Sequence, residues 1–121
     1  MIGWHVTPTR NIESIQANGL HPQIGVRSKA ARESVPAVFL FSSAGACEDG
    51  LMNWMSDEFD DNEPLSFLKI DLTGMSVRNN GGWEIEVREP LAAERILETL
   101  TEQEFPEQHT TQLHLTSSKP L

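Results

Sequence analysis

The decisive stretch is Trp4-His5-Val6-Thr7-Pro8, which predicts a β-strand that passes directly into a helix. The apolar residues Trp4 and Val6 alternate with polar ones, which is the period-2 pattern of a half-buried strand. Thr7-Pro8 is typical of the N-cap and the first position of a following helix. His5 is therefore predicted to point to the face opposite Trp4, near a helix N-terminus whose unpaired N–H groups favour anionic ligands. This predicts a ligand site at His5, and the alternative is a hydrogen-bonded histidine of the sheet.

The helix after this strand is predicted from an apolar stripe formed by Ile12, Ile15 and Leu20. Gly19 is well placed to end the helix in the left-handed conformation, which glycine adopts at little cost. Residues 21–35 then hold few large apolar side chains and are predicted to form a loop.

This loop contains the basic cluster of the chain, which consists of Arg27, Lys29 and Arg32. Guanidinium groups bind phosphate oxygens in pairs, so the loop could hold an anion such as a pyrophosphate. The alternative is a solvated loop with no ligand.

The composition limits the classes of protein to consider. The 121 residues fit a single domain over 1–121, and Cys47 is the lone cysteine, so no intramolecular disulfide can form. The sequence has no apolar run of membrane-spanning length, which predicts a soluble, cytoplasmic protein. With 18 acidic and 9 basic residues the formal charge is −9, which argues against broad nucleic-acid binding. An acidic binding module that occupies a basic groove on a partner remains an alternative.

The rest of the chain predicts an α+β fold with a split, mostly antiparallel sheet and three short helices. The expected elements are a buried central strand at 36–41, a second helix capped by Ser42 and Ser43, strands at 65–72, 75–78 and 83–87, a third helix at 93–100 and a last strand at 110–116. The second helix carries an expected core stripe of Leu51, Met52, Trp54, Met55 and Phe59. The acidic run at 57–63 lacks the glycine and final glutamate of a calcium loop, so no metal site is predicted. On the 83–87 strand and just after it, Glu84, Glu86 and Arg88 are expected to share one face.

In their order, these elements resemble the ADP-ribosyltransferase fold, in particular its small, toxin-like bacterial and phage members. The resemblance spans residues 4 to about 96 and rests on His5-Val6-Thr7, Ile15 to Leu20, Val38 to Ala44, and Trp83 to Val87. Gly19-Leu20-His21-Pro22 is also similar to a motif of the tRNA 2′-phosphotransferases.

The resemblance implies a cleft that binds NAD and breaks the bond between nicotinamide and ribose. It implies that His5 holds a ribose hydroxyl, that the backbone of Val6 pairs with the nicotinamide amide, and that Glu84 stabilises the oxocarbenium-like transition state. The other NAD-binding positions that it implies are Thr7, Ser42 or Ser43 at the ribose, and Arg27 or Arg32 at the pyrophosphate. His5 and Glu84 are then expected on neighbouring strands that line one cleft.

Three departures from the family pattern leave alternatives open. The chain has no tyrosine to stack on nicotinamide, so Phe41 or Trp54 would have to replace it. Val6 stands where a small residue is usual, and Glu86 competes with Glu84 for the catalytic role. The expected function is transfer of ADP-ribose from NAD to an unidentified macromolecule. The alternatives are a non-catalytic acidic binding or inhibitor module on the same fold and a 2′-phosphotransferase-like reaction on RNA.

Overall fold

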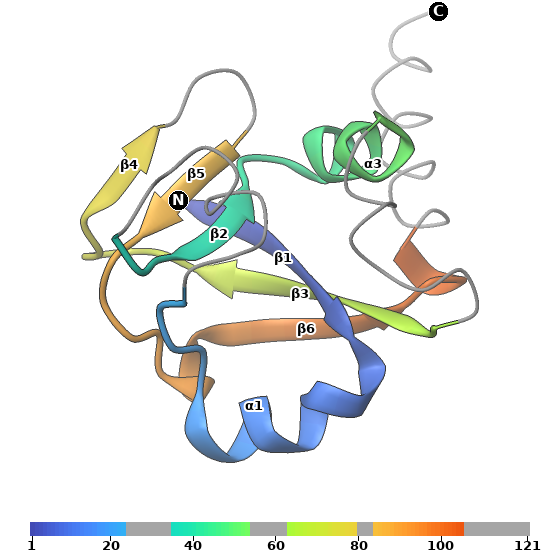
Figure 1. Cartoon of the computed structure of the whole chain (residues 1–121), viewed down its shortest axis with the longest axis horizontal. Helices are drawn as coiled ribbons and strands as arrows, with labels where there is room; N and C mark the ends of the chain where they lie inside the picture. The colour runs from blue at the N-terminus through green and yellow to red at the C-terminus, as the bar shows by residue number, and fades with distance from the viewer. Residues whose placement is uncertain (24–34, 54–62, 80–83, 106–121) are drawn as a thin grey trace, which may run out of the picture.

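The computed structural model describes residues 1–23, 35–53, 63–79 and 84–105, with the side chains of residues 51–53 left aside. Within these ranges six strands form one sheet, accompanied by two α-helices and two short 3₁₀ helices (Figure 1). The elements are β1 (Ile2–Pro8), η1 (Thr9–Asn11), α1 (Ile12–Asn18), β2 (Val38–Phe41), α3 (Ala44–Asn53), β3 (Leu65–Asp71), β4 (Val77–Asn79), β5 (Glu84–Val87), η3 (Ala93–Arg95) and β6 (Ile96–Thr101). The predicted α+β class is confirmed.

The sheet has the strand order β4-β5-β2-β1-β3-β6, and every neighbouring pair is antiparallel. β1 pairs with β3 along its whole length, from Ile2 opposite Asp71 to Pro8 opposite Leu65. With β2, by contrast, β1 is in register only where Trp4 lies opposite Phe41. The sheet therefore consists of two three-stranded halves that meet at this one position, which we call the joint.

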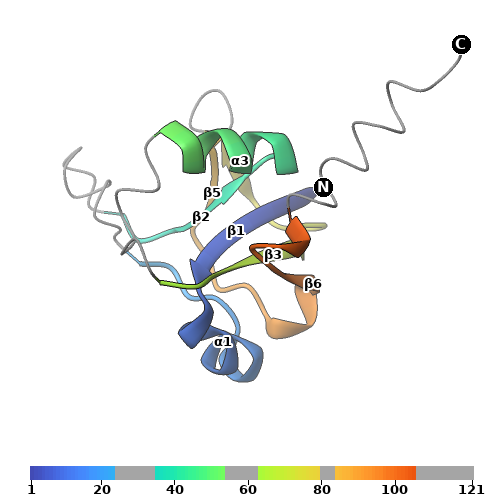
Figure 2. The ribbon, with the colours of Figure 1, turned by 90° about the vertical axis from the view of Figure 1, so that its right-hand side faces the viewer.

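Each face of the sheet is covered by one helix, and Figure 2 shows α1 and α3 on opposite sides. On the α1 face, Ile15 and Leu20 join an aliphatic core from β2, β3 and β5, so the predicted stripe is confirmed. On the α3 face, Trp4 and Phe67 pack with Phe105, whose ring stacks on Phe67 with a centroid separation of 4.2 Å. Since every large side chain of these clusters is taken out of water, both faces contribute hydrophobic stabilisation.

The predicted helix start at Thr7-Pro8 is wrong. The strand continues to Pro8, because Thr7 lies opposite Ser66 and Pro8 opposite Leu65 in the register with β3. The helical turn begins instead at Thr9. Strand pairing over the full length of β3 outweighs the local capping preference of Thr7.

The predicted third helix at 93–100 is also wrong. Only a 3₁₀ turn occupies Ala93–Arg95, and β6 follows it as the edge strand beside β3. The β6 residues alternate between half-buried and exposed, and Leu97 is 51% exposed. This segment has good helix formers, but its period-2 pattern and its pairing with β3 decide the structure.

The other predicted elements agree with the structure where it describes them. The strands expected at 36–41, 65–72, 75–78 and 83–87 correspond to β2, β3, β4 and β5. Ser43 caps α3 as expected, because the Ala46 N–H donates to Ser43 Oγ at 3.0 Å. The basic loop, the apolar stripe of the second helix, nearly all of the acidic run and the strand at 110–116 lie outside the described residues and side chains.

Gly19 ends α1 and connects this helix to the segment after β5. Its φ of +76° is positive, as predicted, but its ψ of −169° is extended rather than left-handed helical. The next residue forms a two-hydrogen-bond bridge, in which the Leu20 N–H donates to the Leu91 carbonyl at 2.8 Å and the Leu91 N–H to the Leu20 carbonyl at 2.9 Å. Gly19 therefore lies against backbone that a larger residue could not approach so closely.

Candidate functional site

His5 lies half-buried beside the joint and bridges the two halves of the sheet. Its Nδ1 lies 2.8 Å from the carbonyl oxygen of Phe39 on β2. A carbonyl can only accept, so Nδ1 carries the proton and Nε2 has the lone pair. Burial lowers the pKa of the His5 imidazole below its usual 6.5, although the bond to the Phe39 carbonyl opposes this shift. The ring is therefore neutral at pH 7.

The second nitrogen of this ring, Nε2, can accept a hydrogen bond. Within the described part of the chain, the hydrogen bond to Phe39 is the one that His5 makes, so Nε2 has no protein partner there. A fixed, neutral imidazole can accept a hydrogen bond from a hydroxyl such as that of a ribose. The reading of His5 as a hydrogen-bonded histidine of the sheet is confirmed, and the ligand site at His5 stays a prediction.

The lowered pKa of His5 predicts how pH affects stability. As the pH falls, the unfolded chain takes up a proton near its ordinary pKa of 6.5, whereas native His5 resists protonation to a lower pH. The contribution of His5 to the free energy of unfolding is therefore complete above the pKa of the unfolded chain. It is lost as the pH falls toward the lower pKa of the native protein. We expect His5→Asn, whose amide nitrogen can still donate to Phe39, to remove this component. Urea denaturation between about pH 7.5 and about pH 5 should show the stability of the unmodified protein falling more steeply than that of the variant. Parallel pH profiles would contradict the assignment.

Glu84 begins β5 and belongs to a row of side chains that crosses three strands. It lies opposite Phe41 on β2, which in turn lies opposite Trp4 on β1. The expectation that His5 and Glu84 lie on neighbouring strands is therefore wrong, because β2 separates β1 from β5. Two strand spacings of about 4.8 Å each lie between their backbones.

The register also assigns these two residues to faces of the sheet. Residues directly opposite in an antiparallel pair point to the same side, so Glu84 starts from the α3 face, with Trp4 and Phe41. His5 lies opposite Leu68, which belongs to the core of the α1 face. The predicted direction of His5, opposite to Trp4, agrees with this register. A ligand that touches both His5 and Glu84 would have to cross the joint.

Glu86, the competing carboxylate, has a different environment from Glu84. Glu86 is only 4% exposed, and its Oε2 lies 3.2 Å from Nε of Arg88, whereas Glu84 is half-buried. A buried carboxylate is costly without a partner, so the contact with Arg88 offsets part of the cost of burying Glu86. Alternation along the strand predicts these charges on one face, and their spacing of two could also have indicated the ion pair, which was not predicted.

The remaining predicted site residues are placed as follows. Val6 packs its side chain into the core of the α3 face. Thr7 is buried, and its Oγ1 accepts a hydrogen bond from Asn11 Nδ2 at 3.2 Å. Ser42 is exposed directly after β2, and Ser43 uses its hydroxyl to cap α3. Arg27 and Arg32 lie outside the described residues.

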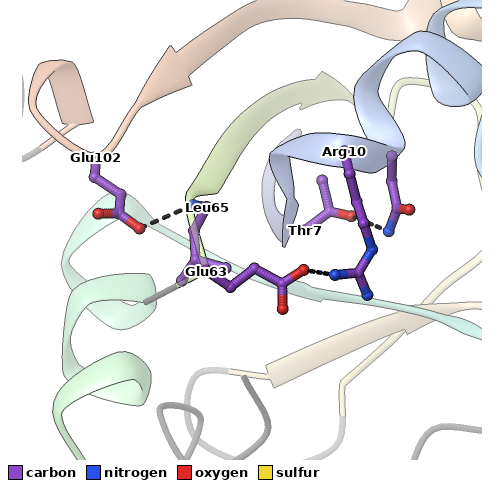
Figure 3. A network of polar contacts seen from close by, with 6 residues as sticks. Thr7, Arg10, Glu63, Leu65 and Glu102 are labelled. Carbon is purple, nitrogen blue, oxygen red and sulfur yellow. Dashed lines mark hydrogen bonds and ion pairs between the residues drawn. The ribbon is translucent and has the colours of Figure 1, made fainter. Parts of the chain in front are cut away.

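A second polar network lies where β1 ends and β3 begins (Figure 3). Arg10 forms an ion pair with Glu63, and Glu102 accepts a hydrogen bond from the Leu65 N–H at 2.8 Å. Nearby, the Thr9 and Ser66 hydroxyls lie 2.8 Å apart. These contacts join η1 and β6 to the start of β3, so this network is structural.

The described parts of the chain offer neither a metal site nor a reactive thiol. There, no three His, Cys, Asp or Glu side chains come together in a way that could hold a metal ion. Burial, with a smaller effect of the Glu48 charge, raises the pKa of the Cys47 thiol to about 12, so Cys47 stays protonated and unreactive. None of the described helices has the length and apolar character needed to cross a membrane.

Compared with known proteins, the chain matches no family model and no curated protein.

Proposed function

We propose that this chain is a domain of the ADP-ribosyltransferase type, which binds NAD, cleaves its nicotinamide–ribose bond and passes ADP-ribose to a macromolecular acceptor. The observation that carries the proposal is the state of His5. Its ring is neutral and is held through Nδ1 by the Phe39 carbonyl, and Nε2 has no partner among the residues that the structure describes. A ring in this state can orient a ribose by accepting a hydrogen bond from its hydroxyl, and it carries no charge that would repel the positive charge developing on the sugar.

The strand order supports the same proposal. The segments on which the family resemblance rests are far apart in sequence, but β1, β2 and β5 are consecutive in the sheet. His5 adjoins the joint, Ser42 follows the end of β2, and Glu84 begins β5 opposite Phe41. These three strands are adjacent, but Glu84 starts from the face opposite to that of His5, so one NAD molecule would have to pass the joint to reach both residues.

In the proposed reaction, Glu84 acts through its charge. As the bond to nicotinamide lengthens, positive charge develops on the ribose, and a fixed carboxylate stabilises that charge more in the transition state than in bound NAD. The leaving nicotinamide takes the bonding electron pair, and the acceptor then attacks the ribose carbon. His5 orients the sugar, and Thr7, which is engaged by Asn11, supports the strand end.

A second candidate is a module that binds a nucleotide or a partner protein without catalysis. It is favoured by the placement of Glu84, which starts from the sheet face opposite to that of His5 with β2 between them. The lack of a tyrosine in the chain points in the same direction. The two candidates differ in whether bound NAD releases nicotinamide.

Thermal unfolding with and without NAD tests the binding step that active transfer requires. We expect NAD to raise the melting temperature, since a ligand at 100 times its dissociation constant stabilises the native state by about 2.7 kcal/mol. His5→Asn should lose most of this rise because it removes Nε2 and keeps a donor for Phe39. His21→Asn is the matched control, since His21 is exposed and, among the described residues, bonds the Asn18 carbonyl of its own segment. No rise at millimolar NAD, or an equal rise in all three proteins, would contradict the proposal.

A further inference from the structure

The face of the sheet that carries Glu84 also carries two arginines around a buried carboxylate. Arg78 on β4 lies directly opposite Glu86 on β5, and Arg88 follows Glu86 by two residues. The ion pair shows that Arg88 points to the same side as Glu86. Both arginines are exposed, whereas the carboxylate between them is buried.

Glu86 orients the guanidinium of Arg88. The contact uses Nε of Arg88, at 3.2 Å from Glu86 Oε2, and so leaves the two terminal amino groups of the fork to other partners. Because Glu86 is held in a strand and is only 4% exposed, the Arg88 side chain is anchored at its base. An anchored fork loses less conformational freedom when it binds a ligand.

Arg78 is the second arginine on this face, beside Arg88. Among the residues that the structure describes, Arg78 has no ion-pair or hydrogen-bonding partner. It stands diagonally across from Arg88, and such diagonal neighbours are about 7–8 Å apart, within reach of long side chains. Two guanidinium groups at this separation can bind the oxygens of one phosphate or of two linked phosphates.

We propose that Arg78 and Arg88 form a binding site for the diphosphate of a nucleotide-type ligand. Glu86 is paired with Arg88, and Glu84 on the same face has an interaction of its own, so Arg78 and Arg88 are the groups here that can meet an anion on a chain of net charge −9. That net charge repels a polyanion such as nucleic acid, whereas a ligand with one or two phosphates needs only the local pair. The site is separate from His5, which starts from the other face, and its existence does not depend on cleavage of NAD.

Calorimetric titration with pyrophosphate at low salt tests the site. We expect the unmodified protein to bind pyrophosphate, and Arg78→Gln to weaken this binding about tenfold or more, the usual effect of losing a charged hydrogen bond. Arg78→Gln is the main variant because Arg88→Gln would also leave the buried Glu86 unpaired. Arg10→Gln is the matched control, since Arg10 is an exposed arginine three strands away from β4. It should leave pyrophosphate binding unchanged.

Separate titrations with inorganic phosphate, ADP-ribose and a single-stranded oligonucleotide identify the class of ligand. We expect ADP-ribose to bind at least as tightly as pyrophosphate, and inorganic phosphate to bind more weakly. No binding of pyrophosphate at millimolar concentration, or equal losses in Arg78→Gln and Arg10→Gln, would overturn the site. Tighter binding of the oligonucleotide than of ADP-ribose would overturn the ligand class. A thermal response to NAD that stays intact in Arg78→Gln would leave the proposed function standing whichever result is found.

Discussion

Gly19→Ala should lower the free energy of unfolding by more than about 3 kcal/mol, through backbone strain and steric overlap together. A Cβ on Gly19 would lie 2.3 Å from the Leu91 carbonyl oxygen and 3.2 Å from the Ala93 nitrogen. Both neighbours are backbone atoms, and Leu91 is held by its bridge to Leu20, so neither can move aside at little cost. The positive φ of Gly19 adds strain for any residue with a Cβ.

Gly74→Ala is the matched control for this prediction. Gly74 has a similar φ of +82°, but a Cβ there would meet no atom within 4 Å. Its substitution should cost only the conformational part, about 1–2 kcal/mol. Urea denaturation of both variants measures the difference. Equal losses at the two positions would show that the close approach to Leu91 contributes nothing to stability.

Glu84→Gln should reduce the rate of nicotinamide release about a hundredfold or more, which corresponds to roughly 3 kcal/mol in the barrier. Glutamine keeps the shape and one acceptor oxygen of Glu84 but removes the charge that the proposed transition state requires. The dissociation constant of NAD should change little, because the charge acts after binding. Single-turnover release of nicotinamide, followed together with NAD titration, separates the two quantities.

Glu86→Gln provides the comparison on the same face of β5. Glu86 is buried and paired with Arg88, so its replacement should lower the stability of the fold more than the rate of release. Equal and small effects on release at both positions would point to the non-catalytic module. The same conclusion would follow if the unmodified protein released no nicotinamide with any acceptor.

The parts of the fold that could be predicted are those that local pattern determines. Alternation in Trp4-His5-Val6 gave the strand and the direction of His5, and Ser43 gave the start of α3, because both depend on residues close in sequence. The segment 93–100 was predicted as a helix because it contains good helix formers such as Ala93, Glu94 and Leu97, whereas its partner β3 lies about thirty positions before β6. Pairing of this kind is a tertiary effect, which local propensity does not contain.

The candidate site shows the same division. Order and resemblance indicate His5 and Glu84 as candidates, but they do not determine where the two side chains lie relative to each other. Whether β5 pairs with β1 or with β2 depends on which strand edges meet in the folded chain, and this decides the face and the separation of the two side chains. The state of His5 likewise depends on the Phe39 carbonyl, 34 residues away. The spacing of two between Glu86 and Arg88 allowed an ion pair, but the burial of Glu86, which makes that pair important, depends on the tertiary structure.

The joint between β1 and β2 has a consequence for cooperativity. Backbone pairing between the halves of the sheet is limited to Trp4 opposite Phe41, so the halves are held together mainly by the hydrophobic clusters that they share on both faces. His5 supplies one further contact by replacing a missing backbone hydrogen bond with one from its ring. A ligand bound across this position would therefore act as an additional cross-link and would make local opening between β1 and β2 rarer, because opening would require its release.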